Sequence, residues 1–233
     1  VPEFVSNGEV SVLTSFGTNS DNEQVGSGGD AYGVIVDANG SLGSFENNNS
    51  FTVTARGPAS SAYGLIDRSG TVTEFINTNF FTMTIDENSA GSLTAVDLSA
   101  NTSGINFVNT GSITGDVYLG SGDNTITLEG MTEDEYNELY DAFIDAGFIE
   151  ENFINVLDRN VNGTIFLAGG DATLDMSKNT ILAGGIYSPN GQLNVNLNDT
   201  STLRVLPDIP LNVENLTLND DSTLVVGDRK SVV

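Results

Sequence analysis

The sequence predicts an all-β fold, a right-handed parallel β-helix solenoid with a short α-helical insertion. Three observations lead to this prediction. Short apolar segments recur about every 31 residues along the first half of the chain, turn-forming Gly, Asn and Ser separate them, and one segment has the apolar spacing of a helix. A unit of this length forms one rung of a solenoid, whose apolar face is buried only when rungs stack.

The repeating unit occupies residues 1–130. The segment 31–35 (AYGVI) recurs as 62–66 (AYGLI) at an offset of 31, and a weaker copy follows at 93–96. Later in each unit a phenylalanine is followed two positions on by asparagine, and then by an apolar-Thr pair. The phenylalanines are Phe45, Phe75 and Phe107, and Phe4, with Val10 six residues on, looks like an earlier copy of the unit. We therefore expect these rings in one column and Val34, Leu65 and Val96 in another.

Three asparagines occupy equivalent positions in these units: Asn47, Asn77 and Asn109. We expect them to stack at one corner of the solenoid, where their amides can hydrogen-bond along the axis. Asparagine also tolerates the left-handed backbone that a sharp corner requires.

Residues 131–160 form the predicted helical insertion. Thr132 and Glu135 make a capping box, and Gly147 suits the residue after the helix. Between them an apolar stripe follows helical spacing, and a second short helix is expected at 150–157. The stripe either covers the flank of the solenoid or binds a partner. Its candidate binding residues are Tyr136, Tyr140 and Phe143.

Residues 161–233 continue the β-helix with shorter rungs. Segment 116–128 aligns with 164–176 at an offset of 48, which a single rung reaches only if it contains the insertion. Segment 197–203 matches 218–224 at an offset of 21. We expect roughly seven rungs in all, or about 35 Å of solenoid.

Composition excludes several classes of function. The chain has 7 Lys and Arg against 32 Asp and Glu, a formal charge of −25, which disfavours nucleic acid and anionic lipid as partners. It contains no Cys and no His, which excludes the usual zinc sites and Ser-His-Asp or Cys-His catalysis. No apolar run reaches the roughly 20 residues of a membrane span, so we expect no direct membrane insertion. From its two ends we interpret the chain as an excised fragment.

Two glycine-aspartate turns resemble calcium-binding repeats, at 120–123 and 169–171. Asp123 and Asp171 are the candidate metal ligands. Calcium turns need the motif in tandem to supply six or more oxygens. Each motif occurs once here, so a plain turn is the favoured interpretation; no cofactor is expected, and calcium is the alternative.

Tyr32 and Tyr63 are the other candidate binding residues, because they occupy equivalent positions in two units. They form either an exposed aromatic ladder for a glycan or protein, or a pair packed beneath a loop. Carboxylates are numerous enough for a glycosidase or lyase, but chance pairs are expected among so many. The chain has no Trp, and its Phe residues fall in core-like columns.

Segments 107–113 (FVNTGSI), 115–124 and 211–224 are similar to the repeats of autotransporter passenger domains of Gram-negative bacteria. The resemblance covers nearly the whole chain outside 131–160. It implies an N-terminal export signal, a C-terminal outer-membrane barrel outside this sequence, and an extracellular or cell-surface location. Many passengers are adhesins; others are proteases, esterases or toxins.

The residues and the resemblance together lead us to expect a non-catalytic adhesin or interaction scaffold. Its partner would be a host or neighbouring-cell protein or glycan. The alternatives are a polysaccharide-degrading enzyme on the same fold, or a structural stalk that holds a distal module. The oligomeric state stays undetermined.

Overall fold

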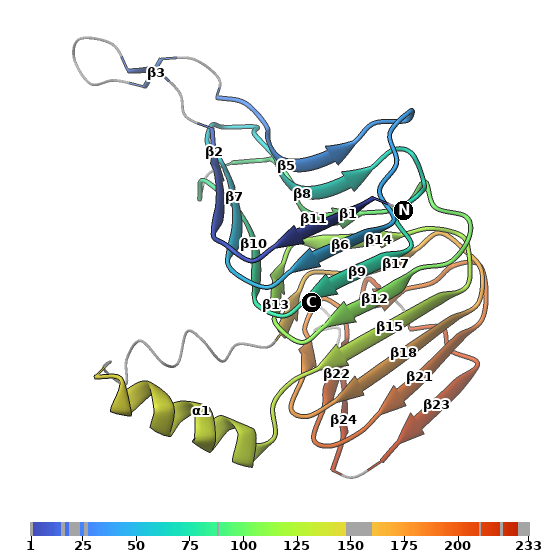
Figure 1. Cartoon of the computed structure of the whole chain (residues 1–233). Helices are drawn as coiled ribbons and strands as arrows, with labels where there is room; N and C mark the ends of the chain where they lie inside the picture. The colour runs from blue at the N-terminus through green and yellow to red at the C-terminus, as the bar shows by residue number, and fades with distance from the viewer. Residues whose placement is uncertain are drawn as a thin grey trace, which may run out of the picture.

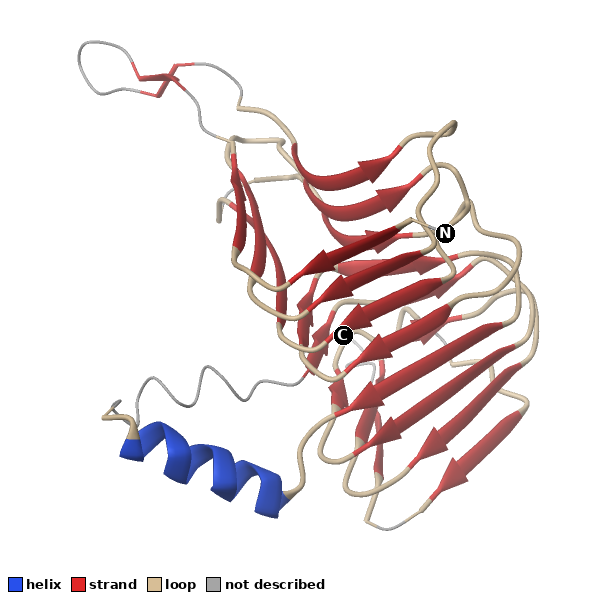
Figure 2. Cartoon of the chain, in the orientation of Figure 1, coloured by secondary structure: helices blue, strands red, loops and turns tan. Residues whose placement is uncertain are grey.

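The chain folds into a parallel β-helix, as predicted (Figures 1 and 2). The computed structural model describes residues 2–14, 17–18, 24–25, 28–87, 89–147, 160–209, 211–219 and 221–227. Within each of the three large sheets all strand pairs are parallel, and the chain visits the sheets in turn. One visit to each sheet makes one rung.

The first sheet contains β1 (Glu3–Ser6), β6 (Ser44–Asn47), β9 (Glu74–Asn77), β12 (Asn106–Asn109), β15 (Asn124–Glu129), β18 (Ala172–Ser177), β21 (Leu193–Leu197) and β23 (Asn215–Leu218). The second contains β2 (Val10–Leu13), β7 (Phe51–Ala55), β10 (Phe80–Ile85), β13 (Ser112–Thr114), β16 (Asn160–Asn162), β19 (Ile181–Leu182), β22 (Thr202–Val205) and β24 (Thr223–Val226). The third contains β5 (Ala31–Val36), β8 (Ala62–Asp67), β11 (Leu93–Asp97), β14 (Asp116–Leu119), β17 (Ile165–Leu167) and β20 (Ile186–Tyr187). An antiparallel hairpin of β3 (Gly17–Thr18) and β4 (Gln24–Val25) projects between β2 and β5 (Figure 1).

The strand registers confirm the predicted columns. Phe45 pairs with Phe75 and Phe75 with Phe107, at offsets of 30 and 32. The next step, from Phe107 to Ile126, has an offset of only 19. In the described part of the chain the first two sheets have eight strands each and the third has six, so the predicted roughly seven rungs fall within this range, although the short rung ending at Ile126 was missed. The longer period ends at Phe107, well before residue 130.

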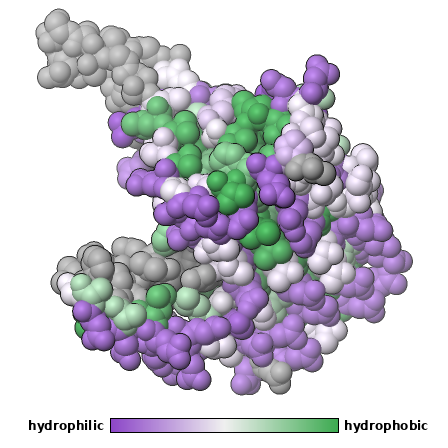
Figure 3. Space-filling view, in the orientation of Figure 1, coloured by the Kyte–Doolittle hydropathy of each residue, from purple (hydrophilic) through white to green (hydrophobic). Residues whose placement is uncertain are grey.

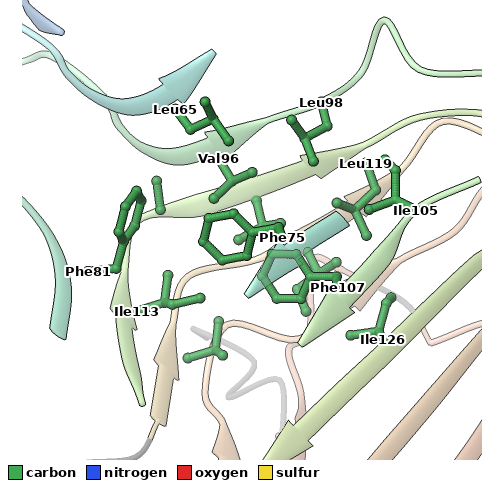
Figure 4. Packing of buried hydrophobic residues seen from close by; sticks show 14 of the residues in the cluster. Leu65, Phe75, Phe81, Val96, Leu98, Ile105, Phe107, Ile113, Leu119 and Ile126 are labelled. Carbon is green, nitrogen blue, oxygen red and sulfur yellow. The ribbon is translucent and has the colours of Figure 1, made fainter. Parts of the chain in front are cut away.

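The core is a set of side-chain columns that run along the solenoid axis (Figure 4). The rings of Phe45, Phe75 and Phe107 stack with centroids 5.5 and 4.9 Å apart. Phe51 and Phe81 stack in the neighbouring column at 4.7 Å and meet the first column edge to face. All five rings are fully buried. Offset-stacked and edge-to-face contacts are the favoured aromatic arrangements, so the repeat of Phe specifies the register of the rungs.

The predicted asparagine stack is also present. Asn47 donates to Asn77 Oδ1 at 2.8 Å, and Asn77 donates to Asn109 Oδ1 at 2.7 Å. These residues end strands β6, β9 and β12 and are not left-handed. The left-handed non-glycine residues among those described lie at this same corner between the first and second sheets, but in the later rungs: Lys178, Asn179, Asp199, Thr200 and Asp221.

The insertion leaves the solenoid between β15 and β16 and contains helix α1 (Glu133–Asp145). The capping box between Thr132 and Glu135 is formed, and Gly147 has the predicted left-handed conformation with φ of +85°. Asn160, the last residue of the predicted insertion, already belongs to β16. The second helix predicted at 150–157 lies outside the described residues. Among the described residues, no helix is long and apolar enough to cross a membrane.

Candidate functional site

Aromatic side chains gather on the outer surface of the third sheet. Strand register places Tyr32 beside Tyr63 in one outward column. A second outward column, further along the strands, begins with isoleucine and continues through Tyr118, Phe166 and Tyr187. We call these five residues, Tyr32, Tyr63, Tyr118, Phe166 and Tyr187, the aromatic face.

The rings of the aromatic face form two short stacks. Tyr32 and Tyr63 lie nearly parallel with centroids 4.8 Å apart, and Tyr118 and Phe166 do the same at 4.8 Å. Tyr187 meets Phe166 edge to face at 6.1 Å. Tyr32 and Tyr187 remain 38% and 37% exposed, so the two ends of the face are open to a partner. The neighbouring Ile35 is 40% exposed and extends this apolar surface.

Three carboxylates flank these rings: Asp30, Asp97 and Asp116. The Tyr32 hydroxyl donates to Asp30 at 3.3 Å. Burial and then the charge of Asp30 raise the pKa of Tyr32. Burial, followed by the charges of Asp116 and Asp97, raises the pKa of Tyr118. Both hydroxyls therefore stay protonated at neutral pH, in a negative local field.

The outer surface of the first sheet differs from the aromatic face. It faces the viewer in Figure 3 and is largely hydrophilic, with Glu74, Asn106 and Asp175 among its outward residues. Side-chain hydrogen bonds link its rungs, as from Asn106 to Glu74 at 3.2 Å and from Asn196 to Asp175 at 2.6 Å. Hydrophobic side chains in this view gather at the N-terminal end of the solenoid (Figure 3). The aromatic face is thus a local feature of the third sheet.

The structure brings Tyr32 and Tyr63 together as an outward ladder, one of the two arrangements open from sequence. Tyr118, Phe166 and Tyr187 were missed as its continuation. The signal was available, because the offsets of 48 and 21 relate these three residues in turn. It was overlooked because the ladder changes column between β8 and β14, where Thr94 and Asp97 interrupt it.

The candidate residues of the insertion lie elsewhere, since α1 leaves the corner between the first and second sheets (Figure 1). The rings of Tyr136 and Tyr140 lie parallel with centroids 6.3 Å apart. Tyr136 and Ile144 remain 38% and 39% exposed, and Tyr136 lines a hollow together with Asn160 and Asn179 of the solenoid. The side chain of Phe143 lies outside the described residues.

A polar corner holds the N-terminal end of α1. Lys178 bonds Glu129 at 2.5 Å and Glu135 at 3.2 Å, and Asn179 donates to the Met131 carbonyl at 2.7 Å. Hydrogen bonds to the two glutamates raise the pKa of Lys178, which therefore remains a cation at neutral pH. Two hollows of about 420 and 350 Å³ flank this corner. The smaller is lined by Thr132, Glu133, Lys178, Asn179, Asp199, Thr200 and Asp221.

The candidate metal ligands Asp123 and Asp171 lie on neighbouring rungs. Asp123 accepts from the Asp171 amide at 3.1 Å, and Asp171 accepts from the Gln192 amide at 3.2 Å. Each carboxylate thus links its own turn to the next rung. Among the described residues, no group of three acidic side chains is placed to hold a metal ion. A calcium site here stays a prediction, for which the turns supply these two carboxylates.

Neither family models, nor curated proteins, nor solved structures give a match to this chain, so its function is argued from the surfaces described above.

Proposed function

We propose that this chain is part of a non-catalytic adhesin or interaction scaffold, exported and displayed at a bacterial cell surface in the manner of an autotransporter passenger. The observation that supports this most is the aromatic face. Tyr is among the residues enriched in the centres of protein interfaces, because it supplies a large contact area with a polar tip. Four tyrosine rings and one phenylalanine ring, in two neighbouring columns of one sheet, form an extended contact surface.

The scaffold supports the same proposal. The rings stand on strands whose backbones are paired on both sides, except at β5 and β20. Side chains held this way lose little further conformational freedom on binding, which favours affinity. The partner would be a protein or glycan of a host or neighbouring cell.

The experiment is a binding screen of the purified chain against cells, matrix proteins and a glycan array. The test variant replaces Tyr32, Tyr118 and Phe166 by Ser. The control replaces Tyr136 and Tyr140 by Ser, removing an aromatic pair from α1. We expect the test variant to lose binding at least tenfold and the control to keep it. Loss in the control alone would move the site to α1. Binding to no target would favour a structural stalk.

The polar corner supports a second candidate function, a polysaccharide-degrading enzyme. Glu133, Asp199 and Asp221 line one hollow together with Lys178, and paired carboxylates are the groups that cleave glycosidic bonds. Lys178 is a poor general base there, because its ammonium is engaged by two glutamates. Turnover on a polysaccharide panel that disappears in an Asp199→Asn/Asp221→Asn variant would establish this function instead.

A further inference from the structure

The aromatic face has a geometry that limits what can bind it. Within each stack the ring planes cover one another, at 4.8 Å and within 8° of parallel. The surface therefore offers ring edges, tyrosine hydroxyls and carboxylates rather than a row of open ring faces. A sugar that lies flat against an aromatic ring needs an open face. Within each of the two stacks, the facing sides of the two rings cover each other and are closed to a sugar.

One open ring face lies at the N-terminal end of the stack. Tyr32 belongs to β5, the edge strand of the third sheet, and among the described residues it has a stacked ring, Tyr63, on one side only. Asp30 stands beside it, within hydrogen-bond distance of the Tyr32 hydroxyl. A ring face next to a carboxylate is a favourable site for a Lys or Arg side chain, through cation–π and ionic contacts together.

The charges along the rest of the face have the same sign. Asp116 continues the Tyr32–Tyr63 column and Asp97 precedes Tyr118 in the neighbouring column, so two carboxylates stand where the stacks meet. Arg68 interacts with Tyr32 electrostatically, but its guanidinium is paired with Asp37 at 3.1 Å. The chain as a whole carries a formal charge of −25. A second copy of this chain, a polyanionic glycan or a nucleic acid would be repelled.

We propose that the aromatic face binds a basic segment of a partner protein, whose Arg and Lys side chains meet Asp30, Asp97 and Asp116 and the open face of Tyr32. This inference rests on the proposed function, since it names the chemical class of the partner for the same surface. Charge complementarity of this kind speeds association and makes it salt-dependent, because the screening length falls from about 30 Å at 0.01 M to about 8 Å at 0.15 M ionic strength.

The test measures binding of a fluorescent peptide that alternates Arg and Ser, by anisotropy at several salt concentrations. Any polyanion attracts such a probe, so the comparison uses two variants with the same change in net charge. Asp97→Asn/Asp116→Asn neutralises the face and keeps the side-chain oxygens that can accept hydrogen bonds. Glu138→Gln/Asp141→Asn neutralises two exposed residues of α1. Tyr32→Ser removes the open ring without changing charge.

We expect the face variant and Tyr32→Ser each to weaken binding about tenfold or more, and the α1 variant to weaken it less than threefold. Equal losses in the two charge variants would overturn the inference, because the attraction would then come from net charge alone. A partner from the binding screen that depends on Tyr32 but is a neutral glycan, or is indifferent to salt, would also overturn it. That result would leave the proposed function standing, whereas a screen without any partner would remove both.

Discussion

Two glycines of the third sheet pack directly against phenylalanine rings of the second. A Cβ atom built on Gly33 would lie 2.6 Å from the Gly64 carbonyl oxygen and 2.7 Å from the Phe51 ring. One on Gly64 would lie 2.4 Å from the Ala95 carbonyl oxygen and 2.5 Å from the Phe81 ring. These distances leave no room for a methyl group. In the third unit Ala95 follows Thr94 where the first two units have glycine, and Ile113 takes the place of phenylalanine. The AYG repeat therefore reflects a packing requirement.

Replacing Gly64 by Ala should destabilise the fold by about 1–3 kcal/mol, the usual cost of overpacking a core. Chemical denaturation monitored by circular dichroism would measure this change. Gly8 is the matched control, since a Cβ there meets nothing within 4 Å. An equal effect at both glycines would show that backbone entropy is responsible, rather than crowding by the Ala95 carbonyl and the Phe81 ring.

The asparagine stack should respond to a single substitution. Asn77 is fully buried and both donates to and accepts from its neighbours in the stack. Changing it to Ala takes a hydrogen-bond partner from the buried amides of Asn47 and Asn109, which costs about 1–3 kcal/mol. Asn106→Ala, at an exposed position of the neighbouring strand, should change stability by less than about 0.5 kcal/mol. Unfolding curves of the two variants that coincide would contradict this prediction.

Sequence reasoning located these columns because a repeated residue identity is visible without a structure. It failed where identity changes while position is kept. Ile126 continues the phenylalanine column, but neither its identity nor its offset of 19 repeats the step before it. Tyr118 and Phe166 were aligned at the offset of 48, but their outward direction was not recognised. The aromatic face was found only in part for this reason, as stacking depends on register and outward direction rather than on one motif.

Among the elements, α1 is distinguished by the way it is attached. The contacts described for its attachment lie at its N-terminal end, where the capping box, Lys178 and Asn179 meet. Bonds from the Thr132 amide and then from Lys178 lower the pKa of Glu135. The start of the helix is therefore fixed to the later rungs by charged and polar groups.

This attachment should weaken in acid. Because the pKa of Glu135 in the folded chain is below its ordinary value of about 4.3, the stabilisation is complete above that pH and is lost as pH falls through the lowered pKa. Carbon-detected NMR of the Glu135 carboxyl would follow this titration. Lys178→Met should raise the pKa of Glu135 only partway, since the Thr132 amide bond remains. An unchanged titration in that variant would contradict a role for the lysine.

The helix itself was predictable in detail, including its cap and its terminal glycine, because these signals are local in sequence. Its anchor was not. The sequence separations of Lys178 from Glu135 and of Asn179 from Met131 are 43 and 48. These pairs meet because one rung places the start of the insertion beside the next corner, and no local pattern records that.

Over the whole molecule, the insertion is an excursion from one rung. The rung that contains it has a register offset of 48, and the two rungs that follow have offsets of 21 each. The insertion accounts for this difference in length. In the following rung the short segment 178–180 connects β18 to β19 at the equivalent corner.

Replacing residues 130–159 by a turn as short as 178–180 should therefore leave a regular solenoid. We expect the far-ultraviolet circular dichroism to lose its helical component. The midpoint of thermal unfolding should shift by only a few degrees, since the described core columns contain no residue of α1. A variant that fails to fold would show that the insertion is part of the core. Such a result would also contradict its interpretation as an appendage.

The solenoid and the later offset of 21 were predictable from repeats, whereas the short rung that ends at Ile126 was not. The short rung between Phe107 and Ile126 breaks the period without any turn signal unique to it. Among the described residues, β20 is the last strand of the third sheet, and the sequence of the next rung contains Pro207 and Pro210. Proline has no backbone N–H to continue a ladder of hydrogen bonds. The end of the third sheet could therefore be predicted from these prolines only after the rungs had been aligned.

The parallel register of the rungs also determines how the molecule responds to tension. Backbone hydrogen bonds between rungs run along the solenoid axis. A pulling force along this axis would therefore break them one rung after another, starting from the end of the solenoid. Each short rung near the C-terminus would then release about 70 Å of chain, and the rung that contains the insertion about 160 Å. The insertion therefore adds extra extensible length to one rung of the solenoid.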